Sequence, residues 1–507
     1  MPAQLAKAWS VALVGLSGAM VEVEAAVSSG LRGTIVVGLP DTAVTEARDR
    51  CRAAMQVTDL GWPEGRVTFN LSPANLPKAG THFDLAMVAA VGATQRLCRQ
   101  EALRQVMLFG EVGLDGQVRP ARGLLPALLE AVRHGFTKVI VPTAQLREAM
   151  LIDGVEVTGV SRIERLFAVL NGGNGDEPPP PTPVAPRSKP LPDMADVAGQ
   201  FEAKWALEVA AAGRHHVYFH GPPGVGKTLL AERLPTLLPD LSPAESREVS
   251  SIHSLAGRPL SDLITRPPFS APHHSASLPA VVGGGAKIAN PGAISMAHRG
   301  VLFLDEAPEF SARTLDSLRV PLESGKVTIS RAYAVTVFPA AFQLVLAANP
   351  CPCGNADTPG QECKCTPFTV RRYASRVSGP ILDRVDIRQQ LQPLQRSFLS
   401  RTHAVGESSA QIAERVAAAR ERQAARLAEV GFQVNGEVPG VVLRKQLPLP
   451  DGIELLEAAV AQGRLSARGV DKVLRLAWTI CDIAGSAKPS QDQLHAALAM
   501  RRGSERC

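Results

Sequence analysis

The stretch HVYFHGPPGVGKTLLAERL, residues 216–234, constrains the fold of this 507-residue chain more than any other feature. It contains the pattern G-x-x-x-x-G-K-T between a short apolar run and a helix-like run. Glycines at these spacings let backbone N–H groups face phosphate oxygens, and the following helix adds its positive N-terminal end. The residues predicted to hold ATP are Gly221, Pro222, Pro223, Gly224, Val225, Gly226, Lys227 and Thr228. Lys227 would reach the β and γ phosphates, and Thr228 would ligate Mg²⁺.

A second run, GVLFLDEAPEF, supplies the acidic partner of this loop. Its four apolar residues predict a buried strand that ends at Asp305. Ligands of α/β sheets bind at the carboxyl ends of the strands, so Asp305 is expected to hold Mg²⁺ through water. Glu306 is then placed to polarise the attacking water, which predicts hydrolysis rather than nucleotide binding alone.

Three further polar residues fit an ATP-hydrolysing site. The strand-like run QLVLAANP ends at Asn349, where P-loop ATPases of the AAA+ class place a polar residue that helps to position the water. Arg384 lies in SGPILDRVDIR, and it is either a surface ion-pair partner or an arginine finger for a neighbouring subunit's ATP. Arg468, near the start of a helix-like run, is either a solvated arginine or a group that reaches the γ-phosphate.

Composition narrows the class of protein. Aromatic residues make up only 4%, which disfavours the base-stacking platforms of single-strand binders. The net charge of +6 permits nucleic-acid binding without demanding it. No run of eighteen apolar residues occurs, so we expect no membrane span. The apolar start resembles a signal peptide, but it runs into the alternating VEVE of a half-buried strand, so we expect a cytoplasmic protein with reduced cysteines.

The Pro- and Gly-rich segment 171–192 is the clearest boundary, and we interpret it as a stiff linker. Before it, residues 1–170 alternate strand-like runs (GTIVVGLP, RVTFNLSP, KVIVP) with an amphipathic helix, LLPALLEAVRHG, and so predict an α/β domain. Residues 193–394 predict a second α/β domain, which carries the phosphate loop. Residues 395–507 contain long helix-like runs and predict a helical domain.

Four of the eight cysteines form the pattern C-x-C-x₉-C-x-C directly after Asn349: Cys351, Cys353, Cys363 and Cys365. A four-thiolate structural zinc site is one interpretation, although zinc ribbons usually space each pair by two to four residues. A lasting disulfide is disfavoured in a reducing compartment. A catalytic thiol has no evident base nearby in the sequence.

The motifs DMADVAGQFEAKWALEVAAAGRHHVYFHGPPGVGKT, SAPHHSAS, VVGGGAKIANPGAISMAHRGVLFLDEAPEF, NPCPCG and RYASRVSGPILDRVDI closely resemble those of the YifB/ComM family of magnesium-chelatase-like AAA+ ATPases. The resemblance covers almost the whole chain. It implies a P-loop AAA+ domain followed by a C-terminal helical lid. It also implies the roles of Walker A lysine, Walker B pair, sensor 1, arginine finger and sensor 2 for Lys227, Asp305 with Glu306, Asn349, Arg384 and Arg468.

The wider group forms hexameric rings and carries two insertions around the core. By resemblance, SLPAVVGGGAKIANPG is the first insertion and SGKVTISRAYAVTVFP the second. Lys287 and Arg331, one in each, would then meet a DNA backbone in a central pore, although each is otherwise an ordinary exposed charge. His273 and His274 lie in a family motif, and the sequence assigns them no role.

The N-terminal domain resembles the proteolytic domain of Lon-type proteases, a ribosomal S5 domain 2-like fold. In that group a serine and a lysine form a catalytic dyad. Here PKAG is followed by Thr81 and then by His82 in the serine position, and Leu125 and Ala127 stand where lysines would be. The resemblance therefore implies a scaffold or a substrate-recognition domain without peptidase activity.

These features together predict an ATP-driven hexameric motor that remodels single-stranded or branched DNA in recombination or natural transformation. The DNA substrate is implied mostly by the resemblance. A magnesium-chelatase-type ATPase subunit and a protein unfoldase are the alternatives.

Overall fold

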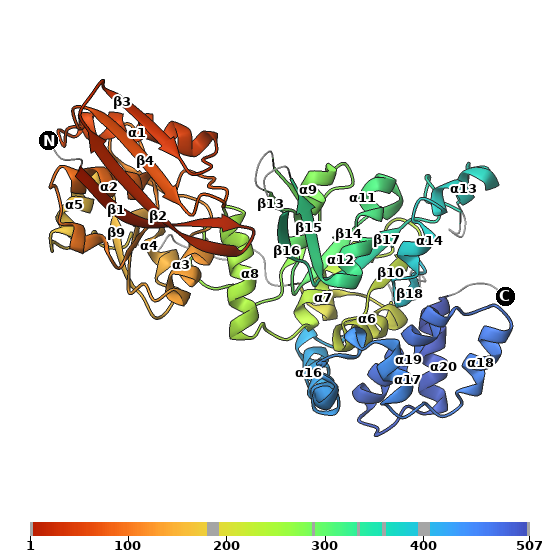
Figure 1. Ribbon diagram of the computed structural model, residues 1–507. Coiled ribbons are helices and arrows are strands. Elements are labelled where there is room, and N and C mark those ends of the chain that lie inside the picture. Colours follow the sequence, from red (N-terminus) through yellow and green to blue (C-terminus); the bar gives the residue numbers. More distant parts are fainter. Residues whose placement is uncertain are drawn as a thin grey trace.

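The protein is described from a computed structural model that covers residues 4–179, 192–285, 289–331, 335–356, 361–393 and 406–503. The chain forms three parts in order: an N-terminal α/β part, a central α/β part and a C-terminal helical part (Figure 1). The architecture is therefore mixed α/β and multidomain, with a helical C-terminal region, as the sequence predicts. In the described part of the chain, no helix is both long enough and apolar enough for a bilayer crossing.

The N-terminal part is built on a seven-stranded sheet in the order β3-β4-β2-β1-β5-β8-β9. The predicted VEVE strand pairs antiparallel with the first strand, and its valines are buried while Glu22 and Glu24 pair with Lys7 on the other face. The strands are β1 (Gln4–Val14), β2 (Ser17–Ser28), β3 (Gly33–Val37), β4 (Arg66–Ser72), β5 (Val106–Leu108), β8 (Lys138–Pro142) and β9 (Glu156–Val160), with a small hairpin of β6 (Glu111–Val112) and β7 (Val118–Arg119).

Helices pack against this sheet. The almost wholly buried α2 (Asp84–Thr94) contacts β1 and β2, while α3 (Leu124–Arg133) shares a second hydrophobic cluster with β1, β5 and β8. The others are α1 (Thr42–Val57), α4 (Leu146–Ala149) and α5 (Ile163–Leu170). Asp176, inside the segment interpreted as a linker, still belongs to this part, because its backbone N–H donates to Gly159 and its carboxylate accepts from Thr143 and Arg165.

The central part contains a five-stranded parallel sheet in the order β11-β14-β17-β10-β18. Its strands are β10 (Val217–His220), β11 (Phe269–Ser270), β14 (Val301–Leu304), β17 (Gln343–Ala348) and β18 (Ile387–Gln390). The inner strands β14 and β17 are buried at every residue, which explains their unbroken apolar sequences. Parallel strands bring all their carboxyl ends to one edge, and this edge carries the predicted ATP-binding residues.

Helices and two hairpins surround the central sheet. Two hairpins, β12 (Gly283–Gly284) with β13 (Asn290–Pro291) and β15 (Lys326–Ser330) with β16 (Val335–Pro339), lie in the two segments that the resemblance gives as insertions. The helices are α6 (Phe201–Gly213), α7 (Lys227–Leu237), α8 (Pro243–Leu255), α9 (Leu278–Val282), α10 (Ala293–Met296), α11 (Ala312–Asp316), α12 (Arg319–Ser324), α13 (Pro367–Ala374) and α14 (Gly379–Leu382).

The C-terminal part is helical throughout its described residues: α16 (Ser409–Leu427), α17 (Gly440–Lys445), α18 (Glu454–Ala461), α19 (Ala467–Ala484) and α20 (Gln491–Arg502). Two of these helices carry clear start and stop signals. Ser408 caps α16 in a capping box, and Gly485 ends α19 with a φ of 72°. Trp478 of α19 is buried, and the Arg426 guanidinium lies 4.2 Å from the centre of its ring.

The N-terminal part packs on the central part through α8, which stands between the two in Figure 1. Ser254 near the end of α8 makes three contacts with the N-terminal part. Its hydroxyl donates to Glu148 Oε1 at 2.6 Å and accepts the backbone N–H of Leu125 at 3.2 Å, and its carbonyl accepts the N–H of Gly123. This joint therefore combines specific hydrogen bonds with apolar packing, because Leu255, Leu260 and Leu263 lie against the N-terminal hydrophobic cluster.

A buried ion pair joins the helical part to the central sheet. Lys472 of α19 donates to Asp386 Oδ1 at 2.7 Å and to the carbonyl of Arg384, and Asp386 also accepts the backbone N–H of His216. Burial alone would raise the pKa of Asp386, but the charge of Lys472 outweighs it and holds that pKa well below its usual range. The pair therefore stabilises the fold at neutral pH, and this contribution is lost only as the pH falls below the ordinary carboxylate range.

We expect Lys472→Met to lower the free energy of unfolding by about 3–5 kcal/mol, because it leaves the Asp386 carboxylate buried and unpaired. Denaturant unfolding followed by tryptophan fluorescence measures the change, since Trp478 lies on the same helix. Lys445→Met, at an exposed lysine of α17, is the matched control. Equal stability of the two variants would contradict the role of the pair.

Candidate functional site

The phosphate loop joins β10 to α7 at the carboxyl edge of the central sheet. Gly224 and Gly226 adopt φ angles of 79° and 95°, a region that side chains disfavour. A Cβ added at either glycine would meet nothing within 4 Å, so the loop encloses open space instead of packing against protein. The backbone is thus shaped to receive a ligand at the N-terminus of α7.

Lys227 connects this loop to the neighbouring strand. Its ammonium donates to the carbonyls of Gly221 (2.6 Å) and Pro222 (2.8 Å) and to Oδ1 of Asn349 (2.9 Å) at the end of β17. Burial lowers the pKa of Lys227 to about 8, against the opposing charges of Asp305 and Glu306. The structure therefore brings Lys227 and Asn349 into direct contact, although 122 positions separate them in the sequence.

Asp305 and Glu306, which follow the strand β14, lie at the same edge of the sheet as Lys227 and Asn349. Thr228 Oγ1 donates to Asp305 Oδ2 at 2.7 Å, which places the two expected Mg²⁺ ligands side by side. Hard oxygen donors of this kind are the ligands that Mg²⁺ prefers. Glu306 follows with a positive φ of 51°, and its backbone N–H donates to Asp305 Oδ1. This sharp turn leaves the Glu306 side chain exposed at the sheet edge.

His274 is a functional candidate to which the sequence assigned no role. Its Nδ1 lies 3.3 Å from Oε2 of Glu306. The register explains the contact: Ser270 of β11 pairs with Leu302 of β14, and His274 and Glu306 each lie four residues further along. The contact of His274 with Glu306 could be foreseen only from the pairing of β11 with β14. A two-residue strand next to prolines is too short to recognise in the sequence. His273 stacks on His274 with ring centres 4.1 Å apart, and its Nδ1 faces Ser275.

Arg384 and Arg468 lie at the opposite edge of the sheet. Arg384 precedes β18, which runs parallel to β10, so it sits at the end of the sheet away from the phosphate loop. Its guanidinium donates to Glu323 Oε1 (2.6 Å) and to the Pro380 carbonyl (2.8 Å). Arg384 and Arg468 line one cavity of about 530 Å³. The structure therefore groups the two arginines together and apart from Lys227 of the same chain.

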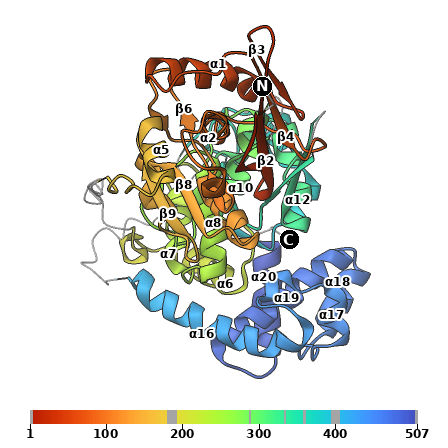
Figure 2. The same cartoon turned by 60° about the vertical axis from the view of Figure 1, so that its left-hand side comes forward.

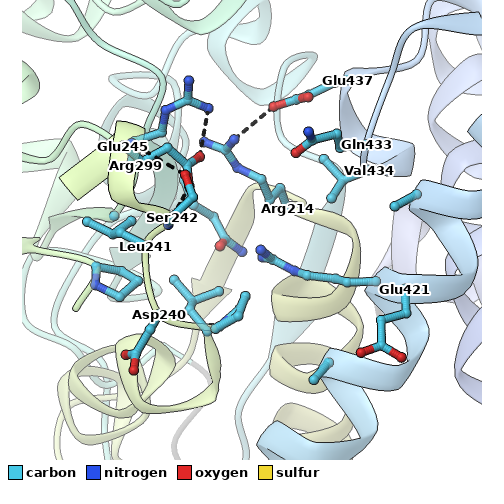
Figure 3. A pocket seen from close by; sticks show the side chains of 18 residues that line it. Arg214, Asp240, Leu241, Ser242, Glu245, Arg299, Glu421, Gln433, Val434 and Glu437 are labelled. Atoms are coloured by element: carbon cyan, nitrogen blue, oxygen red, sulfur yellow. Dashed lines mark hydrogen bonds and ion pairs between the residues drawn. The ribbon is translucent and has the colours of Figure 1, made fainter. Parts of the chain in front are cut away.

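A second pocket, of about 400 Å³, lies between the central and helical parts (Figure 3). Arg214 pairs with Glu437 at 2.8 Å and Arg299 with Glu245 at 3.3 Å across it. Burial lowers the pKa of Arg420, which also lines the pocket, to about 9. The arginines are balanced by glutamates and Asp240, so this pocket shows no net attraction for an anionic ligand.

Of the two residues expected to contact DNA, only Arg331 lies within the described part of the chain. Arg331 directly follows the strand β15, and its Nε donates to the Gly285 carbonyl at 3.0 Å, so the two insertions touch. Lys287 lies outside the described residues. A DNA contact by either residue stays a prediction.

The positions that correspond to the Lon-type dyad are part of the N-terminal core. His82 is buried and stacks on Phe109, its Nε2 lies 2.7 Å from the Val11 carbonyl, and burial lowers its pKa to about 4. Leu125 and Ala127 are fully buried. These side chains thus fill apolar space, and the likeness of this domain to Lon-type proteases stays a prediction.

The four cysteines converge in space. Their sulfur atoms all lie within 4.8 Å of one another, and Cys351 Sγ is 3.3 Å from that of Cys353 and 3.7 Å from that of Cys363. Cys351 is buried, and the other three are partly or fully exposed.

Comparison with known proteins agrees with this geometry. Residues 193–399 match the family model "Magnesium chelatase, subunit ChlI", residues 23–145 match "Subunit ChlI of Mg-chelatase" and residues 406–501 match "Magnesium chelatase, subunit ChlI C-terminal". The fold and the site define a P-loop ATPase of the AAA+ class.

Relatives of nearly equal length show which family within this class the chain belongs to. An uncharacterized protein of Mycobacterium tuberculosis is 50% identical over 98% of this chain and 99% of its own. The uncharacterized protein YifB of Escherichia coli is 40% identical over 97% of this chain and 96% of its own. Competence protein ComM of Haemophilus influenzae is 39% identical over 98% of this chain and 97% of its own. The chain belongs to the YifB/ComM family of magnesium-chelatase-like AAA+ ATPases.

His274→Ala is expected to lower kcat for ATP hydrolysis about 10- to 100-fold, because Glu306 loses the neighbour that fixes its direction. ATP affinity should stay near its original value, since it depends on the phosphate loop rather than on Glu306. Steady-state kinetics and binding of a fluorescent ATP analogue separate the two effects. His274→Asn, which keeps a hydrogen-bonding nitrogen, should recover part of kcat.

His273→Ala is the comparison variant for this prediction, because His273 faces Ser275 instead of Glu306. It should retain more activity than His274→Ala. An equal loss in both variants, or a fall in ATP affinity that matches the fall in kcat, would show that the motif acts only in folding.

Proposed function

We propose that this protein is an ATP-driven ring motor that remodels single-stranded or branched DNA. The observation that carries the ATPase part is the group at one sheet edge: Lys227 bonded to Asn349, and Thr228 bonded to Asp305. The proposed compartment is the cytoplasm, and the proposed assembly is a homohexamer.

The phosphate loop, residues 221–228, would hold ATP through its backbone N–H groups and Lys227. Thr228 and Asp305 would hold Mg²⁺, which when bound neutralises charge on the β and γ phosphates. Glu306 would orient and polarise the attacking water, with Asn349 on its other side and His274 fixing the direction of Glu306. These roles need the side chains close together at one edge, and the distances above support that requirement.

Arg384 and Arg468 lie at the sheet edge opposite the phosphate loop, and this position favours action on the ATP of a neighbouring subunit. Arg384 and Arg468 lie away from the phosphate loop of their own chain, and a ring brings that face toward the ATP of a neighbour. Arg384 would then act as an arginine finger, and Arg468 as the sensor 2 arginine of the same neighbouring site. The ion pair of Arg384 with Glu323 would open when the neighbour's nucleotide arrives.

The DNA substrate rests on similarity and charge. The relative ComM is named a competence protein, which suits a role in DNA uptake or recombination. The net charge of +6 and the touching insertions at Arg331 agree with a DNA-facing surface. The N-terminal domain would be a Lon-like scaffold without peptidase activity, since His82 stands in the serine position and Leu125 and Ala127 stand where lysines would be. The magnesium-chelatase models make a chelatase-type ATPase subunit the second candidate.

Single-stranded and branched DNA should raise the ATPase rate, whereas unfolded protein should not. Arg331→Ala should weaken DNA binding and lower the slope of log affinity against log salt by about 1, since one phosphate contact is lost. Fluorescence anisotropy over a salt series measures both quantities. Arg104→Ala, at an exposed arginine of the N-terminal domain, is the control. Stimulation by unfolded protein alone would defeat the DNA assignment.

Subunit mixing tests the trans arrangement. Lys227→Ala and Arg384→Ala should each lower the ATPase rate at least about 1,000-fold. A 1:1 mixture of the two variants should recover activity, since about a quarter of the interfaces in a closed ring would join an intact loop to an intact arginine. A mixture of Lys227→Ala with Glu306→Gln is the control and should stay inactive, because Lys227 and Glu306 serve the same subunit's site. An inactive first mixture would contradict action in trans.

A further inference from the structure

The cysteine cluster has the geometry of a tetrahedral metal site. Zinc–sulfur bonds of about 2.3 Å place tetrahedral ligand sulfurs about 3.8 Å apart. Cys363 Sγ lies 3.7 Å from the sulfurs of both Cys351 and Cys353, and all four sulfurs lie within 4.8 Å. These separations are too long for disulfide bonds and match four thiolates around one ion. The two C-x-C pairs therefore face each other from the two ends of the 351–365 segment.

The first pair is tied to the ATP site at two points. Cys351 follows Asn349 by two residues, and Asn349 accepts a hydrogen bond from Lys227. Gly354 lies against the phosphate loop, because a Cβ added there would lie only 2.7 Å from Cδ of Pro223 and 2.8 Å from its Cγ. The same short turn thus contacts the loop that binds phosphate and follows the strand end that holds Lys227.

The second cysteine pair, Cys363 and Cys365, precedes the stretch of chain that continues to Arg384. Cys365 is followed by Thr366, whose side chain caps α13, and the chain then runs through α14 to Arg384. An ion bound by both pairs would fix the start of this path relative to the phosphate loop.

We propose that Cys351, Cys353, Cys363 and Cys365 bind one Zn²⁺ ion and that this ion braces the phosphate loop through Gly354 and Pro223. The metal does no chemistry on ATP. It keeps the turn after Asn349 seated on the loop, so that the loop is preorganised for nucleotide. ATP affinity therefore depends on zinc.

Metal analysis tests the site itself. The purified protein should contain about one zinc ion per chain. The variant with both Cys353→Ser and Cys365→Ser should lose it, whereas Cys98→Ala, at a buried cysteine of the N-terminal domain, should keep it. Zinc-free protein with four reactive thiols would overturn the site, and iron with visible absorbance would overturn the assignment of zinc.

Nucleotide binding tests the brace. Zinc removal by a chelator, or the double cysteine variant, should weaken binding of a fluorescent ATP analogue about tenfold, because an unbraced loop must be ordered on binding. Zinc added back after chelation should restore the affinity. A zinc-loaded protein whose affinity does not change on zinc removal would overturn the brace while leaving the metal site intact.

A glycine pair removes the risk that the cysteine variants fail to fold. Gly354→Ala should keep zinc and weaken ATP binding, since its methyl group would displace Pro223. Gly431→Ala is the matched control, because Gly431 has a similar φ of 76° but has nothing within 4 Å of an added Cβ. Equal ATP affinity in the two variants would contradict the contact. These measurements involve neither DNA nor turnover, so they stand apart from the proposed DNA substrate.

Discussion

Parallel pairing in the central sheet is the constraint on which the rest of the structure depends. Because β14, β17 and β10 all run in one direction, their carboxyl ends meet at one edge. Asp305, Asn349 and the phosphate loop each follow directly from one of these strand ends, so Lys227 can bond to Asn349 and Thr228 to Asp305. A reversed strand would send one of these groups to the far edge. The chemistry of the site is thus a consequence of strand direction.

The same parallel pairing brings the amino ends of these strands together at the opposite edge of the sheet. Residues that enter the strands lie there, among them Arg384, Asp386 and His216. The buried contact between Lys472 and Asp386 fixes helix α19 on this edge and thereby sets Arg468 beside Arg384. The helical part of the chain therefore contacts the sheet at the edge opposite the phosphate loop. Figure 2 shows this part below the central sheet, with α19 and α20 side by side.

The sequence predicted those features that local chemistry determines. The apolar runs before the phosphate loop, before Asp305 and before Asn349 are strands, and the long helix-like runs of the C-terminal part form helices, among them α16 and α19. Features that depend on which strands are neighbours could not be predicted. The contact of His274 with Glu306 needs the pairing of the two-residue β11 with β14. The contact of Gly354 with Pro223 needs the return of a turn to a loop that lies far away in the sequence.

In the N-terminal domain, packing restricts the chemistry that is open to Leu125 and Ala127, the two residues that stand where Lon-type proteases would have lysines. Leu125 and Ala127 lie on α3, and this helix packs against α8 of the ATPase core. Ser254 of α8 accepts the backbone N–H of Leu125 and donates to Glu148, so this face is already committed to holding two domains together. Leu125 and Ala127 are fully buried, so a lysine at either position would carry an ammonium group into the interior, which is unfavourable. Apolar residues at these positions thus suit the buried hydrophobic cluster in which α3 packs.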